Sequence, residues 1–148
     1  MISAGISNFN ASAIDALLSG TSVKPAFNQC GFSVANHNSK ETSVGRDDVT
    51  RARCSTLNIT YGAYSPLNHG NVLKEKVVLQ VAKAHNVSAA VVALRWLVQG
   101  GHTFTTASMS EDYDVEDLSV FDLVLTHEEM ASLEAAGQPD PTPGNMLG

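Results

Sequence analysis

The sequence predicts an α/β fold in which short parallel strands alternate with helices. Four short apolar or β-branched segments are each followed by a segment whose apolar residues recur at helical spacing, which is typical of βα units. N-cap residues and glycines mark the boundaries between them. Four strands and about five helices are half of what a closed (β/α)8 TIM barrel requires. We therefore expect half of such a barrel.

The N-terminal part of the chain contains three predicted strands and two predicted helices. Asn10 is placed to cap a helix that carries Ile14 and Leu18 and ends at Gly20. A second, weakly patterned helix covers residues 46–56. Residues 31–45 are rich in Ser, Asn, Gly and Thr, and this composition predicts a long surface loop. The predicted strands cover residues 2–6, 25–28 and 59–64.

The C-terminal part contains the fourth predicted strand, residues 102–106, and the remaining helices. After a loop at residues 65–72, helices are expected at residues 74–85 and 89–99, the second capped by Ser88. The acidic residues 111–117 open a short helix, and Thr126 and Glu129 form a capping box for a helix at residues 127–136. Residues 1–136 are thus expected to form one half-barrel unit, followed by an irregular Pro/Gly tail at residues 137–148.

Charge and composition exclude several classes of function. The net charge of −6 gives no electrostatic basis for binding nucleic acid or an anionic membrane, and no apolar run is long enough for a direct membrane span. No secretory signal is visible, and Cys30 and Cys54 fit free thiols, so we expect an intracellular protein of the cytoplasm or an organelle stroma. Charged residues make up 16% of the chain, below the usual ~25%, which hints at a partly covered surface.

Polar side chains follow the predicted strands, at the end where ligands meet βα sheets. An amide both donates and accepts hydrogen bonds and therefore suits another amide, while a tyrosine ring suits stacking on a flat heterocycle. These side chains are compatible with a nicotinamide; the alternative is that Ser7, Asn8 and Asn28 merely cap helices and close turns. The five histidines lack metal-like spacing, so no metal site is predicted. The clusters are Ser7-Asn8, Asn28-Gln29, Tyr64-Ser65 and Ser108.

An ordered set of motifs resembles the second half of the aldo-keto reductase family, over residues 1–136. The motifs are Gly5-Ile-Ser-Asn-Phe9, Lys24-Pro-Ala-Phe-Asn-Gln29, Ala63-Tyr-Ser-Pro-Leu67, Ala93-Leu-Arg-Trp-Leu-Val-Gln99, and Val120-Phe-Asp122 before Thr126-His-Glu-Glu-Met130. The resemblance implies that Ser7, Asn8 and Gln29 hold the nicotinamide carboxamide of NAD or NADP. It also implies that Tyr64 stacks on the nicotinamide ring, and that Ser65 and Leu67 contact the diphosphate side.

The segment that binds the adenosine end in this family departs from the family pattern. Ser108 retains the serine of a Pro-Lys-Ser segment, but Ala107 stands in place of its lysine, Tyr113 in place of an arginine and Asp117 in place of an asparagine. Acidic residues would repel the 2′-phosphate of NADP, so NAD is expected over NADP, if any cofactor binds. The alternative is that the acidic residues are the solvated start of a helix, favoured by the helix dipole.

The resemblance also implies that the family's catalytic groups belong to its first four βα units, whereas this sequence resembles the units from the fifth onward. Those groups are a tyrosine acid, a lysine, an aspartate and a histidine. Tyr61, Tyr64 and Tyr113 have no lysine placed by motif to lower a pKa, so no catalytic residue is predicted here. We expect the chain to be inactive alone.

A half-barrel has two open sheet edges and an uncovered inner face, which we expect to be apolar. A protein partner is therefore expected, as a homo-oligomer or a larger complex. The favoured interpretation is a non-catalytic structural or accessory subunit of a larger assembly. The alternative is the cofactor-binding half of an NAD(P)-dependent carbonyl oxidoreductase completed by another chain. A third hypothesis is that the sequence is a piece of a longer protein.

Overall fold

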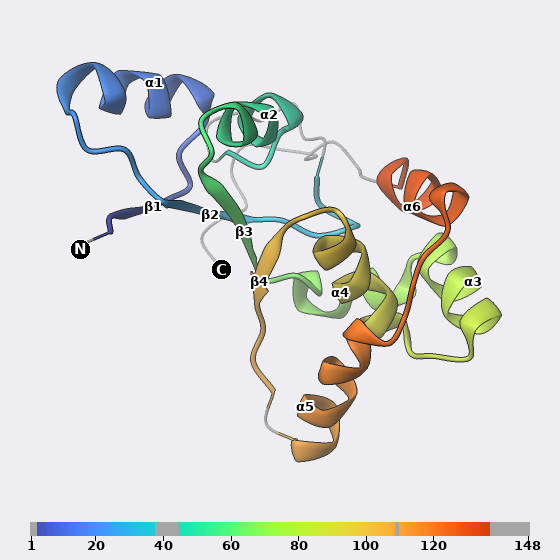
Figure 1. Ribbon diagram of the computed structural model, residues 1–148. Coiled ribbons are helices and arrows are strands. Elements are labelled where there is room, and N and C mark those ends of the chain that lie inside the picture. Colours follow the sequence, from blue (N-terminus) through green and yellow to red (C-terminus); the bar gives the residue numbers. More distant parts are fainter. Residues whose placement is uncertain (1–2, 38–44, 109, 137–148) are drawn as a thin grey trace.

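A computed structural model describes residues 3–37, 45–108 and 110–136 of the chain. It contains one four-stranded parallel sheet with the strand order β1-β2-β3-β4, so each strand lies beside its neighbour in the sequence (Figure 1). This is the sheet expected for half of a barrel. The predicted N-terminal tip, Ile2, and the predicted tail at residues 137–148 lie outside the described residues. The strands are β1 (Gly5–Ser7), β2 (Phe27–Gly31), β3 (Thr60–Tyr64) and β4 (Thr103–Thr105).

Six α-helices lie in the described part of the chain, one more than the approximate count from sequence. The predicted loop at residues 65–72 also contains short 3-10 turns, η1 (Asn68–Gly70) and the start of η2 (Val72–Lys74). A third such turn, η3, covers Ser119–Phe121. The α-helices are α1 (Ala11–Gly20), α2 (Asp48–Thr56), α3 (Lys76–His85), α4 (Ala89–Gln99), α5 (Glu111–Leu118) and α6 (His127–Glu134).

The predicted helix caps are confirmed. Asn10 accepts a hydrogen bond from the backbone N–H of Ala13 at 2.8 Å, and Ser88 caps α4 in the same way. At α6, both hydrogen bonds of the capping box between Thr126 and Glu129 are present. The second strand was predicted at residues 25–28 but runs from Phe27 to Gly31, because its pairing with β3 extends it beyond Asn28. A cap depends on residues within one turn, whereas the end of a strand depends on its neighbour.

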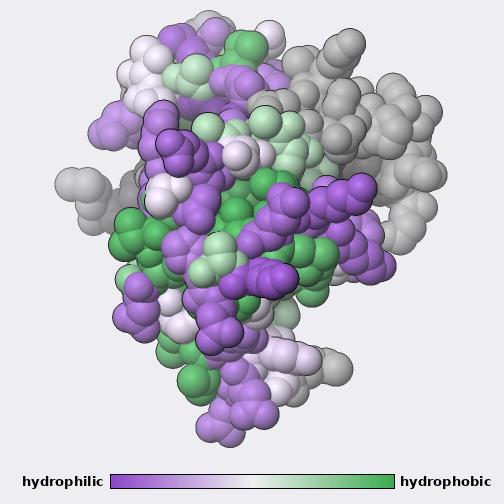
Figure 2. Space-filling view, turned by 90° about the vertical axis from the view of Figure 1, so that its right-hand side faces the viewer, coloured by the Kyte–Doolittle hydropathy of each residue, from purple (hydrophilic) through white to green (hydrophobic). Residues whose placement is uncertain are grey.

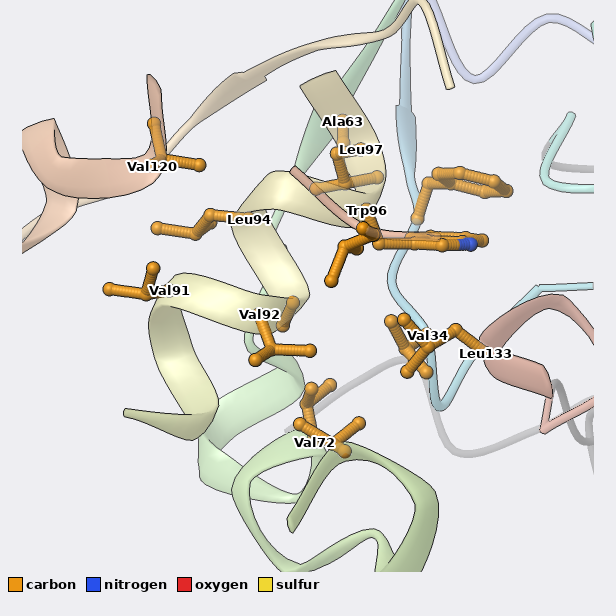
Figure 3. Close-up of a cluster of buried hydrophobic side chains, with 14 of the residues drawn as sticks. Val34, Ala63, Val72, Val91, Val92, Leu94, Trp96, Leu97, Val120 and Leu133 are labelled. Atoms are coloured by element: carbon orange, nitrogen blue, oxygen red, sulfur yellow. The ribbon is translucent and has the colours of Figure 1, made fainter. Parts of the chain in front are cut away.

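The hydrophobic core lies between the sheet and α4, which buries six of its eleven residues. Figure 3 shows Trp96 and Leu97 of α4 close to Ala63 of β3, with Val91, Val92 and Leu94 on the preceding turns. The Trp96 ring stacks on Phe32 with ring centroids 5.3 Å apart. This layer of side chains fixes α4 against the sheet. It therefore also holds β3 and β4, the strands before and after this helix in the chain, in place.

The predicted surface loop at residues 31–45 is wrong for the residues that the structure describes. Phe32, Val34 and His37 are almost completely buried. Phe32 and His37 both contact the Trp96 ring, and His37 forms hydrogen bonds with the carbonyl oxygens of Ser33 and Glu134. The abundance of polar residues hid Phe32 and His37, whose partner Trp96 lies about 60 residues further along the chain. Residues 38–44 lie outside the described part.

The two faces of the sheet differ sharply in burial. On the helix-covered face, Asn28, Cys30, Tyr61 and Ala63 are buried. The opposite face carries alternate residues of each strand, and the expectation that it is apolar is wrong. Most of its side chains are polar or absent, and several are exposed because no helix covers them. They are Gly5, Ser7, Phe27, Gln29, Gly31, Thr60, Gly62, Tyr64, Thr103 and Thr105.

Candidate functional site

Four of the predicted site residues meet at the carboxyl ends of β1, β2 and β3. We call this group, Ser7, Asn8, Gln29 and Tyr64, the strand-end shelf. The Ser7 hydroxyl donates to the carbonyl oxygen of Gln29 at 3.0 Å, and the backbone N–H of Asn8 donates to the same oxygen at 2.8 Å. The backbone of β2 therefore fixes where β1 ends, and the side chains of the shelf gather around that point.

Tyr64 connects the third strand of the shelf to the first. Its hydroxyl donates to Oδ1 of Asn8 at 3.2 Å. Its ring lies directly over Gly31, where an added Cβ would come within 3.2 Å of the ring. Because Gly31 has no side chain, the ring lies flat across the end of β2 and remains half-buried. One face of the aromatic ring rests on protein, which suits stacking of a flat ligand on the other face.

The backbone turns sharply at both ends of the shelf. Asn8 has a φ of 57° and Ser65 a φ of 50°. Residues other than glycine adopt this left-handed backbone conformation only at a cost in free energy. At Asn8 the conformation is supported by the backbone hydrogen bond to Gln29 and the side-chain bond from Tyr64. These turns end the strands abruptly and point the following loops away from the sheet.

Gln29 extends the shelf to the fourth strand, through a residue that the sequence prediction missed. Its side-chain Nε2 donates to Oγ1 of Thr105 at 3.3 Å, across the intervening strand. Gly62 lies opposite Gln29 in the register, and the space over Gly62 is filled by the Phe27 ring, with which a Cβ at Gly62 would clash. The position of Thr105 at the end of a predicted strand could have marked it. Asn28, in contrast, is fully buried on the other face and bonds to the backbone of Phe9, so it closes the turn after β1.

A cleft of about 530 Å³ continues from the shelf, and we call it the loop cleft. It contains the predicted residues Ser65 and Leu67, with Thr105 on the opposite side. Asn68 and His69, both with positive φ, form its rim in the turn η1. The full lining is Ser65, Pro66, Leu67, Asn68, His69, Gly70, Thr105, Thr106 and Ala107.

A second cleft, also about 530 Å³, shares Leu67, Thr106 and Ala107 with the first, and we call it the acidic cleft. It includes the predicted residue Ser108 and brings together the departures from the family pattern, Ala107, Tyr113 and Asp117. Burial, followed by the charges of Glu116 and Asp114, raises the pKa of Asp117. Glu116, one of the acidic residues at 111–117 that the sequence analysis expected to repel a 2′-phosphate, also lines the cleft. The rest of the lining is Leu73, Ser88, Ala89, Ala90 and Thr106.

The buried cysteines and Tyr61 lie behind the sheet, away from the shelf. Both thiols are free, as expected, and burial raises the pKa of Cys30 to about 11. Burial also raises the pKa of Tyr61 strongly, and its hydroxyl donates to the carbonyl oxygen of Gly45 at 2.8 Å. A thiol with a raised pKa is a poor nucleophile and such a phenol a poor acid, so these groups serve packing.

The described residues contain neither a metal-binding cluster nor a single membrane-spanning helix. Within residues 3–37, 45–108 and 110–136, no group of three or more His, Cys, Asp or Glu side chains is arranged to hold a metal ion. In the same ranges, no single helix has the length and apolar character to cross a membrane; α3 and α4 meet that test only together, as a pair bent by 96°.

Comparison with known proteins agrees with this geometry. The sequence profile described as the Aldo/keto reductase family matches residues 2–138. Glyoxal reductase of Bacillus subtilis is 32% identical over 146 residues, which cover 97% of this chain and 50% of the relative. The aldose reductase of Schistosoma japonicum superposes with a TM-score of 0.81 at 30% identity, covering 93% of this chain and 42% of that structure.

A solved structure with a bound cofactor is similar as well. A mutant of Gox0644 in complex with NADPH matches with a TM-score of 0.82 at 26% identity, over 96% of this chain and 49% of that structure. The chain thus spans about half the length of the relatives it matches. From the matched profile, the ordered motifs and the four-stranded half of a (β/α)8 barrel, this chain belongs to the aldo/keto reductase family.

Proposed function

We propose that the chain is the cofactor-binding half of an NAD(P)-dependent carbonyl oxidoreductase. The observation that carries the proposal is the strand-end shelf, in which Tyr64 rests flat on Gly31 and bonds to Asn8. The Asn8 amide bonds to Tyr64, and the Ser7 hydroxyl and the Gln29 amide belong to the two neighbouring strands, so amide and hydroxyl groups are available for recognition of a carboxamide. The residues therefore fit a nicotinamide, which when bound supplies hydride for carbonyl reduction.

Each shelf residue has a distinct task in this proposal. Tyr64 supports one face of the nicotinamide ring, so only the other face is open to a substrate. Ser7, Asn8 and Gln29 fix the rotation of the carboxamide through hydrogen bonds. The loop cleft, where η1 turns back over the strand ends, accommodates the diphosphate. None of these groups is placed to donate the proton that carbonyl reduction needs, so that proton comes from outside the described residues.

The acidic cleft leads us to propose a preference for NAD over NADP. Glu116 and Asp117 line it together, and Ala107 offers no cation there. A 2′-phosphate near two carboxylates is disfavoured by Coulomb repulsion, while the ribose hydroxyl of NAD is a hydrogen-bond donor to them.

Titration of the purified chain with NADH and NADPH by calorimetry tests cofactor binding. We expect saturable binding, tighter for NADH. Gln29→Leu, which removes the amide at similar volume, should weaken binding at least tenfold, whereas Gln80→Leu on the exposed surface of α3 is the matched control and should not. A folded chain that binds neither dinucleotide at millimolar concentration would overturn the proposal.

A second candidate function is that of a non-catalytic accessory subunit. It is favoured by the same acidic cleft. Ala107, Tyr113 and Asp117 replace the residues that bind the adenosine end of the cofactor in the family pattern, so binding of that end should be weaker. An assay of small-aldehyde reduction, measured as the consumption of NADH, distinguishes the two candidate functions. The cofactor-binding half should gain turnover when a polypeptide with the family's first four βα units is added, and an accessory subunit should not.

A further inference from the structure

We propose that His69 is a pH-dependent contact of the cofactor's diphosphate. His69 belongs to the lining of the loop cleft, and protonation of its imidazole adds a positive charge there. The affinity for a dinucleotide should therefore rise as the pH falls through the range in which histidine gains a proton. This inference rests on the proposed function, because it concerns the cleft that accommodates the diphosphate.

The backbone around His69 has an unusual conformation. Asn68, His69 and Gly70 have φ values of 44°, 52° and 82°, so three consecutive residues lie in the left-handed region. The backbone N–H of Asn68 donates to the carbonyl oxygen of Ser65 at 2.9 Å, and that of Gly70 donates to Leu67 at 2.9 Å. Left-handed backbone outside glycine costs free energy and is concentrated at ligand-binding sites. The turn thus holds an exposed imidazole at the rim of the cleft.

Among the described lining residues of the loop cleft, only His69 can carry a positive charge. The other lining residues are uncharged, and Ala107 stands where the family pattern has a lysine. The chain as a whole has a net charge of −6, so its overall field disfavours binding of an anion. The negative charges of a diphosphate in this cleft therefore interact most favourably with a protonated His69.

Other titratable groups of the described structure lie near the loop cleft without lining it. The turn η2 packs against η1 and carries Lys74, and Glu75 follows it in the chain. The adjoining acidic cleft contains Tyr113, Glu116 and Asp117. Protonation of its two carboxylates at low pH would reduce the repulsion of an anion, in the same direction as protonation of the imidazole. An experiment must therefore distinguish the histidine from these carboxylates.

Calorimetric titration with NAD+ and with ADP-ribose, at about pH 8 and about pH 5.5, tests the inference. ADP-ribose carries the same diphosphate diester but lacks the nicotinamide, so it probes the loop cleft without the strand-end shelf. The charge of the diester does not change in this pH range, and NAD+ is stable in mild acid, whereas NADH is not. We expect both ligands to bind at least about fivefold more tightly at the lower pH.

Substitutions at His69 isolate the effect of its charge. His69→Asn cannot gain a proton, and asparagine tolerates a positive φ, so the turn should persist while the pH dependence disappears. His69→Lys is charged at both pH values, so its affinity at the higher pH should match that of the unmodified chain at the lower pH. His127→Asn, at an exposed histidine of α6, is the matched control and should retain the pH dependence. Figure 2 views the molecule from the side of α3 and α6, where many hydrophilic groups lie at the surface.

A double variant, Glu116→Gln with Asp117→Asn, distinguishes the carboxylates from the histidine and should retain the dependence on pH. Persistence of that dependence in His69→Asn, or its loss in the double variant, would overturn the inference. So would binding of both ligands with equal affinity at the two pH values, a result that leaves the proposed function intact. A folded chain that binds neither ligand would instead overturn the proposed function, and this inference with it.

Discussion

The hydroxyl of Tyr64 donates a hydrogen bond to Oδ1 of Asn8 over 3.2 Å, and so connects the ends of β3 and β1 across the intervening strand. Gly31 of β2 lies beneath the ring and makes the connection possible. Asn8 is held in a left-handed conformation at the same point. One contact therefore fixes the position of the ring and of an amide, the two groups that the proposed nicotinamide site needs most.

Separate substitutions at Tyr64 should distinguish its ring from its hydroxyl. Tyr64→Phe removes the bond to Asn8 but retains the stacking surface, and we expect cofactor affinity to fall by about threefold to tenfold. Tyr64→Ala also removes the stacking surface, worth about 1–3 kcal/mol, so affinity should fall at least a further fivefold. Calorimetric titration with NADH measures both. Equal losses in the two variants would contradict stacking by Tyr64.

Gly31→Ala should weaken cofactor binding without touching any polar group of the site. The new Cβ would lie 3.2 Å from the Tyr64 ring, closer than ordinary van der Waals contact, so the ring must tilt away. We expect at least a threefold loss of NADH affinity by calorimetry. Gly20→Ala at the end of α1, where nothing lies within 4 Å of an added Cβ, is the control and should bind NADH normally.

Neutralising the acidic cleft should shift the cofactor preference. Glu116→Gln together with Asp117→Asn removes both carboxylates that line it, and the affinity for NADPH relative to NADH should rise about tenfold or more. Asp122→Asn, at an exposed position outside the cleft, is the control for the loss of a surface carboxylate elsewhere and should leave the ratio unchanged. An unchanged ratio in the double variant would show that the carboxylates do not face the 2′ position.

His102 should make the protein less stable as the pH falls. Burial, aided by the charge of Arg51, lowers the pKa of His102 to about 4 from an ordinary value of 6.5. The unfolded chain therefore binds a proton at this residue below about pH 6.5 that the folded chain does not accept until about pH 4. The contribution of the neutral His102 to the free energy of unfolding is complete above about pH 6.5. It is lost progressively as the pH falls toward about 4, by up to about 3 kcal/mol.

Urea unfolding between pH 7 and pH 4.5 checks this dependence. The His102 ring packs edge-on against Phe32 and Tyr61, so His102→Phe retains an aromatic ring there. It should show a shallower decline of the free energy of unfolding with falling pH. His127→Phe, at an exposed histidine, should retain the slope of the unmodified chain. Identical slopes in all three proteins would refute the assignment.

Local features were predictable from the sequence because their causes are local. The caps at Asn10, Ser88 and Thr126 act within three residues, and the alternation of strands and helices follows from the spacing of apolar residues. The ordered motifs likewise located the residues of the shelf. Predictions that depended on distant partners were less reliable. Phe32 and His37 were assigned to a surface loop, because the Trp96 ring that both contact lies about 60 residues away in the sequence.

The sequence by itself determined the βα order, the family, and that Ser7, Asn8 and Tyr64 lie at strand ends, whereas Gln29, expected after the second strand, lies within it. Only the tertiary structure decided which of these side chains meet. Gly31 leaves room for Tyr64 and Gly62 for the Phe27 ring, Gln29 reaches Thr105 across β3, and Asn28 is turned to the buried face. It also decided that the uncovered face of the sheet is mainly polar. Side-chain direction alternates along a strand, so burial and contact depend on register with neighbouring strands, which local sequence does not encode.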